Sequence, residues 1–90
     1  MSIQEKINSG QATIVDVRTP GEFMSVHVEG AVNIPLNEVT SRLEEFEKMD
    51  TIVLCCASGC RSGQATDYLK EKGVDAYNGG GWAIVEAMKM

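Results

Sequence analysis

Near its middle the chain reads Thr51-Ile-Val-Leu-Cys-Cys-Ala-Ser-Gly-Cys-Arg-Ser-Gly-Gln-Ala65. The apolar residues 52–54 run into a pair of cysteines, as in a buried strand. Small residues and Arg61 follow, and a helix is predicted over about residues 62–72. A strand, a loop containing glycine and a helix N-terminus together direct backbone N–H groups at a common centre, which attracts anions. Such a setting lowers the pKa of a cysteine and makes its thiolate a nucleophile.

The rest of the chain alternates short β-branched runs with helical patterns. Ser2 and Glu5 have capping-box spacing, and Gly73 suits the end of a helix. We expect strands at residues 12–17, 31–34, 51–55 and 74–77, with helices near the N-terminus and over 22–26, 36–46, 62–72 and 82–88. This alternation predicts a single α/β domain over residues 1–90, with a mainly parallel sheet.

In parallel sheets, ligands bind at the carboxyl ends of the strands. We expect Cys56 at one such end, Arg18 at the end of the first strand, and the Asn78-Gly-Gly-Gly81 segment after the last strand. Asp16, Arg18 and Glu22 are predicted to form a charge network beneath the cysteine loop. Three loops are therefore expected to converge on one site.

The loop has a chemical interpretation that follows from its residues. Cys56 is predicted to be the first residue after the strand, so that its sulfur lies at the floor of the loop. Gly59 permits a positive φ, Arg61 is a donor for anionic oxygens, and Ser62 is expected at or near the helix N-cap. Cys55 is predicted to point to the opposite face and to serve packing. The predicted binding loop consists of Ala57, Ser58, Gly59, Cys60, Arg61 and Ser62.

Composition restricts the function classes. The net charge of −5, with no basic cluster, argues against a nucleic-acid partner. No apolar stretch has the length of a membrane span and no signal-peptide pattern is present, so we expect no membrane association. Three cysteines do not make a disulfide framework, which favours the reducing cytoplasm, with the periplasm as the alternative if a leader was removed.

Four separated motifs resemble those of the single-domain rhodanese family, the thiosulfate-type sulfurtransferases. They occur in the family's order and span nearly the whole chain, which makes the resemblance specific. They are Asp16-Val-Arg-Thr-Pro-Gly-Glu-Phe23, Val26-His-Val-Glu-Gly-Ala-Val-Asn-Ile-Pro35, Cys56-Ala-Ser-Gly-Cys-Arg-Ser62 and Asn78-Gly-Gly-Gly-Trp82. The departures are Val26, where the family usually has glycine, and the family's short first edge strand, which we expect to be missing or reduced.

The resemblance implies a small rhodanese-like domain with a sheet of four to five strands and helices on both faces. Cys56 would take a sulfane sulfur from a donor such as thiosulfate, become a persulfide, and pass the sulfur to cyanide or a thiol. Arg61 would contact the anionic donor, and Asp16 and Arg18 would support the loop. We expect a monomer without a cofactor or a metal, which exchanges sulfur with small molecules or with a protein donor or acceptor.

Alternatives remain open at this point. Related phosphatases and arsenate reductases have five residues between cysteine and arginine, whereas four separate Cys56 from Arg61, which argues against phosphate chemistry. A persulfide carrier or redox sensor with little thiosulfate activity is the main alternative. An inactive interaction module is another, although the intact Cys56 and Arg61 argue against it.

The roles of two further side chains are less well determined. Cys60 is interpreted first as an inert loop residue and second as a thiol that forms a disulfide with Cys56 upon oxidation. A zinc site made of the three cysteines and His27 is disfavoured, because their spacing lacks the usual C-x-x-C pattern. His27 is expected in a structural turn.

Overall fold

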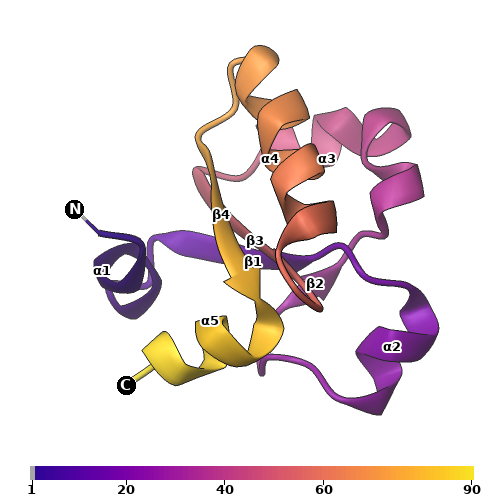
Figure 1. The fold of residues 1–90 in the computed structure, drawn as a ribbon. Coiled ribbons are helices and arrows are strands. Elements are labelled where there is room, and N and C mark those ends of the chain that lie inside the picture. The colour runs from indigo at the N-terminus through magenta and orange to yellow at the C-terminus, as the bar shows by residue number, and fades with distance from the viewer. Residues whose placement is uncertain (1) are drawn as a thin grey trace.

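A computed structural model describes residues 2–90, and in it four parallel strands form one sheet (Figure 1). The sheet order is β2-β1-β3-β4, so β3 lies between β1 and β4. The strands are β1 (Ala12–Asp16), β2 (Val32–Asn33), β3 (Thr51–Cys56) and β4 (Ala76–Gly81). The α/β fold with a parallel sheet is therefore confirmed, with four strands.

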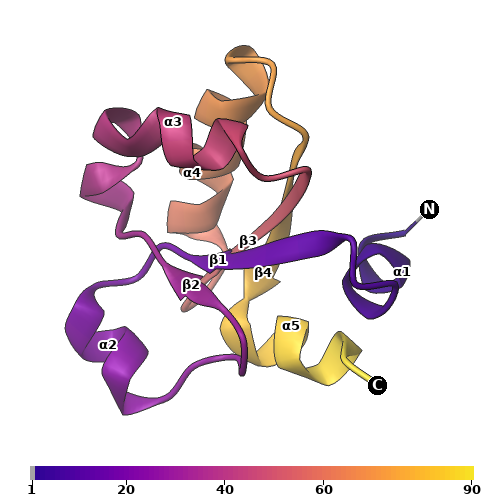
Figure 2. The ribbon, with the colours of Figure 1, turned by 180° about the vertical axis from the view of Figure 1, so that it is seen from behind.

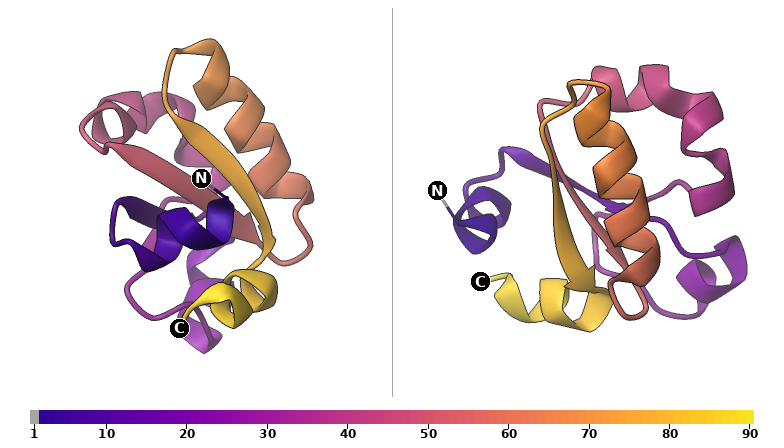
Figure 3. Two further views of the ribbon diagram at one scale, coloured as in Figure 1. Left: turned by 90° about the vertical axis from the view of Figure 1, so that its left-hand side faces the viewer. Right: turned by 45° about the horizontal axis from the view of Figure 1, so that its top comes forward.

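Helices cover both faces of the sheet (Figure 3). One face carries α1 (Ile3–Asn8) and α5 (Trp82–Met88), and the other carries α3 (Leu43–Glu47) and α4 (Cys60–Glu71). The short helix α2 (Pro20–Ser25) follows β1 and lies to the side of β2 (Figure 2).

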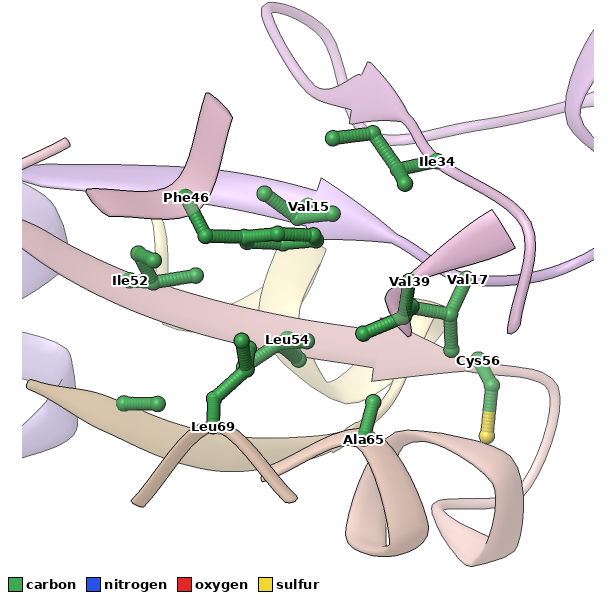
Figure 4. Packing of buried hydrophobic residues seen from close by; sticks show 11 residues of the cluster. Val15, Val17, Ile34, Val39, Phe46, Ile52, Leu54, Cys56, Ala65 and Leu69 are labelled. Atoms are coloured by element: carbon green, nitrogen blue, oxygen red, sulfur yellow. The ribbon is translucent and has the colours of Figure 1, made fainter. Parts of the chain in front are cut away.

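The strand β3 is the centre of the hydrophobic core, because its residues 52–56 are fully buried. Successive side chains of a strand point to opposite faces. Ile52, Leu54 and Cys56 join the cluster under α3 and α4 (Figure 4), whereas Val53 and Cys55 join the cluster under α1 and α5. The alternation therefore separates the two adjacent cysteines, as predicted.

Several local predictions are confirmed. Ser2 and Glu5 form the capping box of α1, Gly73 follows α4 with a φ of 81°, and α5 covers the predicted range. The helix α2 begins earlier than predicted, at Pro20, because Thr19 caps it together with Glu22. No helix among residues 2–90 combines the length and the apolar character that crossing a membrane requires.

The predicted continuous helix over residues 36–46 is wrong. The segment forms two short 3-10 helices, η1 (Leu36–Glu38) and η2 (Thr40–Arg42), before α3. Ser41 donates its hydroxyl hydrogen bond to the Glu38 carbonyl oxygen at 3.0 Å, which competes with regular helical hydrogen bonding. Val39 and Phe46 are nonetheless buried, so the apolar spacing correctly identified the inward side chains.

The predicted boundaries of three elements near the cysteine loop are also wrong. Cys56 is the last residue of β3 rather than the first residue after it, and α4 begins at Cys60. Gly59 is the N-cap of α4, with a φ of 100°, so Ser62 lies inside the first turn. The three glycines 79–81 belong to β4 instead of following it. Glycine suits these positions because neighbouring atoms leave no room for a Cβ atom at Gly79 and Gly81.

Candidate active site

The Cys56 thiol lies at the carboxyl end of β3, with its sulfur directed at the first turn of α4 (Figure 4). The backbone N–H of Gly59 donates to Cys56 Sγ with an N–S distance of 2.9 Å, and that of Ser62 donates at 3.4 Å. The Ser62 hydroxyl oxygen is also 3.4 Å from the sulfur. The left-handed φ of Gly59 turns the chain so that these donors converge on one atom.

The surroundings of Cys56 favour its thiolate. Burial raises the pKa of the Cys56 thiol, but hydrogen bonds from the Ser62 hydroxyl and from the amides of Ser62, Ser58 and Gly59 outweigh burial, so the pKa lies below its ordinary value. Hydrogen bonds to a charged form stabilise that form. A buried sulfur that is nevertheless inclined to ionise is typical of a nucleophile rather than of a packing residue.

Cys55 has the opposite character. Burial, with the nearby Asp16 carboxylate as the second cause, raises the pKa of its thiol to about 12. Its side chain packs in the cluster that contains Val53 and Val85. The structure is therefore consistent with the predicted packing role of Cys55.

Asn78 joins the cysteine loop to β4, which the sequence did not predict. Its Oδ1 accepts hydrogen bonds from the Ser62 hydroxyl at 2.7 Å and from the Gly80 N–H at 3.0 Å. Its Nδ2 donates to the Gly59 carbonyl oxygen at 3.1 Å. The available signal was its place in the Asn78-Gly-Gly-Gly-Trp82 motif, to which no side-chain role was attached.

The glycines of β4 lie directly against the loop. A Cβ atom on Gly81 would be 2.8 Å from the Ala57 carbonyl oxygen, and one on Gly59 would be 3.3 Å from Gly80 Cα. Both distances are shorter than ordinary van der Waals contact. The absence of side chains at the glycines of β4 therefore allows the loop to pack this closely on the sheet.

Arg61 is held by an ion pair that was not predicted from the sequence. Its Nη1 and Nη2 donate to the two carboxylate oxygens of Glu22 at 2.7 and 3.1 Å. The pKa of Glu22 is lowered to about 2, mainly by the hydrogen bonds from Arg61 and secondly by the hydrogen bond from the Thr19 backbone N–H. Both side chains are partly exposed. An anionic ligand that binds Arg61 in the same way has to replace the Glu22 carboxylate.

Asp16 and Arg18 form a separate, buried ion pair. The Asp16 carboxylate accepts from the Arg18 backbone N–H and guanidinium, and Arg18 Nη2 also donates to the Val26 carbonyl oxygen at 2.6 Å. Asp16 is paired in register with Cys55, so its side chain lies on the face of the sheet opposite the Cys56 thiol. The predicted single network with Glu22 is thus two ion pairs on different elements, and Asp16 and Arg18 brace the turn after β1.

The remaining candidate side chains, Cys60 and His27, are exposed. Cys60 is exposed at the first position of α4. His27 is exposed, its Nδ1 is 2.6 Å from the Phe23 carbonyl oxygen, and its ring stacks on Phe23 at 3.8 Å, which fits a structural turn. Within the described part of the chain, no three His, Cys, Asp or Glu side chains are grouped as metal ligands.

Comparisons with known proteins identify relatives of this fold and site. A family model described as a rhodanese-like domain matches residues 2–86. Thiosulfate sulfurtransferase PspE of Escherichia coli strain K12 is 44% identical over 61 residues, covering 66% of this chain and 59% of that protein. A sulfurtransferase of Allochromatium vinosum is 33% identical over 70 residues, covering 78% of this chain and 65% of that protein. The chain thus spans less than two thirds of the length of both relatives.

A solved structure described as a rhodanese with anions from E. coli is also similar. It has a TM-score of 0.73 and 38% sequence identity, and the match covers 81% of this chain and 89% of that chain. The agreement extends over most of both chains, so it concerns the domain as a whole.

Proposed function

The chain belongs to the family of rhodanese-like domains, and on that basis we propose that it is a sulfurtransferase whose nucleophile is Cys56. The observation that carries the proposal is the Cys56 sulfur, which is buried at a strand end and receives hydrogen bonds from two backbone N–H groups. These bonds lower its pKa although burial raises it. Similar proteins named sulfurtransferases support the reaction class.

The proposed reaction consists of two displacements at sulfur. The Cys56 thiolate attacks the outer sulfur of thiosulfate, an S–S bond forms, and sulfite leaves with the electron pair of the broken S–S bond. A cyanide ion or a thiolate then attacks the outer sulfur of the persulfide, and Cys56 leaves as a thiolate. Because the first product departs before the acceptor reacts, ping-pong kinetics are expected.

The loop supplies electrostatic stabilisation to both steps. Negative charge resides on Cys56 Sγ before the first step and after the second, where the Gly59 and Ser62 N–H groups already point. Donors that are oriented in advance need no rearrangement as the charge develops. Arg61 is the proposed contact for the oxyanion end of thiosulfate, once the donor has replaced Glu22.

One experiment tests the assignment. The reduced protein is incubated with thiosulfate, the cysteine that gains one sulfur atom is located by tandem mass spectrometry, and thiosulfate:cyanide turnover is measured in parallel. Cys56→Ser should abolish both signals, whereas Cys60→Ser, at the exposed thiol, should retain them. Turnover that survives in folded Cys56→Ser would exclude Cys56 as the nucleophile.

A persulfide carrier that works with a partner protein is the second candidate, and the Glu22–Arg61 ion pair favours it. This pair occupies the guanidinium that a small anionic donor would need. In that case thiosulfate would load Cys56 poorly, and a protein persulfide would load it well. The same mass measurement, with a cysteine desulfurase and cysteine as the sulfur source, distinguishes the two functions.

A further inference from the structure

The Asn78 amide has only one orientation that satisfies its neighbours. The Gly80 N–H can only donate, so it requires the amide oxygen, and the Gly59 carbonyl can only accept, so it requires the amide nitrogen. Flipping the amide would break both hydrogen bonds. Asn78 therefore presents an acceptor, Oδ1, to the Ser62 hydroxyl, and that hydroxyl is the donor of the 2.7 Å hydrogen bond.

Two acceptors compete for the single proton of the Ser62 hydroxyl. While the proton points at Asn78 Oδ1, the Ser62 oxygen presents lone pairs to Cys56 Sγ at 3.4 Å. A neutral thiol satisfies this arrangement by donating its S–H to the Ser62 oxygen. A thiolate has no proton to donate, so it gains a hydrogen bond from Ser62 only if the hydroxyl turns toward the sulfur, which leaves Asn78 Oδ1 with the Gly80 N–H alone.

We propose that Asn78 is a positioning residue that competes with the Cys56 thiolate for the Ser62 hydroxyl proton, and so limits how readily the nucleophile ionises. The inference takes Cys56 as the nucleophile of the proposed function. Asn78 acts through Ser62 and through the loop carbonyl of Gly59, and it donates no hydrogen bond to the sulfur itself. When the sulfur is neutral, as in the thiol or at Sγ of a persulfide, the hydroxyl returns to Asn78.

Other charged or titratable groups near the Cys56 thiol could also affect its ionisation. Arg61 on α4 carries a positive charge that interacts with Cys56, but it is paired with Glu22 of α2. Cys55 on β3 has a thiol pKa of about 12 and is neutral at ordinary pH. The segment of β4 beside the loop, residues 78–81, consists of Asn78 and glycines and has no titratable side chain. The hydrogen-bond competition is therefore separable from titration of these neighbours.

A double-mutant cycle tests the proposal without any sulfur donor. The pKa of Cys56 is measured from the pH dependence of iodoacetamide alkylation, followed by tandem mass spectrometry, in wild type, Asn78→Ala, Ser62→Ala and the double variant. Asn78→Ala should lower the pKa more when Ser62 is present than in the Ser62→Ala background. The difference should be about 0.5 to 1, which corresponds to one hydrogen bond.

The cycle also separates the proposal from a purely structural role. If Asn78 only holds the loop through Gly59 and Gly80, its removal shifts the pKa equally in both backgrounds, and the proposal is wrong. Asn78→Asp provides a second variant, because it keeps the acceptor and should raise the pKa more when Ser62 is present. Equal rises would also overturn the proposal. Absence of a persulfide in wild type would contradict the proposed function alone, since alkylation needs no sulfur transfer.

Discussion

At the scale of single residues, the adjacent cysteines show how position on a strand determines the surroundings of a thiol. Both side chains are fully buried. Cys55 packs with Val53 and Val85. Among the causes that set its pKa, only the Arg18 charge favours the thiolate, and none is a hydrogen bond. Cys56 faces the first turn of α4, where two backbone N–H groups donate to its sulfur and the Ser62 hydroxyl oxygen lies 3.4 Å from it. The environment on each face of the sheet, and not burial itself, distinguishes the proposed nucleophile from the proposed packing residue.

This difference predicts the order of alkylation. Because the pKa of Cys56 is lowered, its thiolate fraction rises at a lower pH than that of an ordinary cysteine. A pKa of about 12 leaves Cys55 with a thiolate fraction of roughly 10⁻⁴ at pH 8. An iodoacetamide time course at pH 8, read by tandem mass spectrometry, should label Cys56 well before Cys55. Equal labelling rates in the folded protein would contradict the assigned environments.

The Glu22–Arg61 ion pair predicts a change in donor affinity. Glu22→Gln removes the competing charge but preserves the capping box of α2, because glutamine also serves at that position. We expect KM for thiosulfate to fall by about twofold to fivefold with little change in kcat, since exposed ion pairs contribute up to about 1 kcal/mol.

The matched control for this change is Glu86→Gln. It alters the net charge equally, but on α5, where Glu86 lies 4.0 Å from Lys89. An equal fall in KM in both variants would show a general charge effect instead of competition at Arg61.

At the scale of elements, the packing of β4 depends on glycines, because a side chain at Gly79 or Gly81 would collide with neighbouring atoms. A Cβ atom on Gly79 would be 2.7 Å from Val85 Cγ2 and 2.8 Å from Val53 Cγ1. Gly79→Ala should therefore destabilise the domain by about 1 to 3 kcal/mol, as overpacking does. Urea unfolding measures the change.

Gly21→Ala is the control for Gly79→Ala. Gly21 lies in α2 with nothing within 4 Å of its Cβ position, so alanine there should be neutral or stabilising because of its helix propensity. Similar destabilisation by both substitutions would show that the crowding at β4 is not the cause.

The elements predicted well from the sequence are those with local signals. The capping box of Ser2 and Glu5, the apolar run of β3 and Gly73 at the end of α4 each depend on residues close together in the chain. The failure at β4 depends on tertiary context. The glycines of β4 have low strand propensity, and they are in the strand because Val53, Val85 and the loop pack against them.

The same distinction applies to the site. Cys56 and the left-handed Gly59 could be predicted, since a strand, a loop and a helix that follow one another are local features. The partners of the loop come from elsewhere, because Glu22 is 39 residues before Arg61 and Asn78 is 16 residues after Ser62. A single sequence does not determine such pairings, because many carboxylates and amides could supply them.

At the scale of the whole molecule, stability is limited because a domain of 90 residues has a modest core. A net stability of about 5 to 13 kcal/mol is typical for this size. The buried Asp16–Arg18 pair joins distant parts of this small domain. Arg18 donates to the Val26 carbonyl oxygen after α2, and Asn33 of β2 donates to the carbonyl oxygens of Asp16 and Arg18 at 2.9 and 3.0 Å.

Removing one member of this pair should therefore affect global folding. Arg18→Met keeps a long apolar stem but leaves the Asp16 carboxylate buried without its partner, which typically costs about 3 to 5 kcal/mol. That loss is a large share of the expected stability, so the midpoint of urea unfolding should fall strongly. Asp16→Asn added to Arg18→Met should recover part of the loss, because the remaining amide carries no charge.

The exposed Arg42 serves as the control for Arg18, because it also forms ion pairs but is not buried. It contacts Glu38 and Glu45 at 3.1 and 2.6 Å, with all three side chains substantially exposed. Arg42→Met should cost no more than about 1 kcal/mol, because solvent screens such pairs. If Arg42→Met and Arg18→Met destabilised the protein equally, the buried charge would not be the reason. A large loss of stability for Arg18→Met but not for Arg42→Met, partly restored by Asp16→Asn, would identify the buried ion pair as the interaction that holds α2 and β2 against the end of β1.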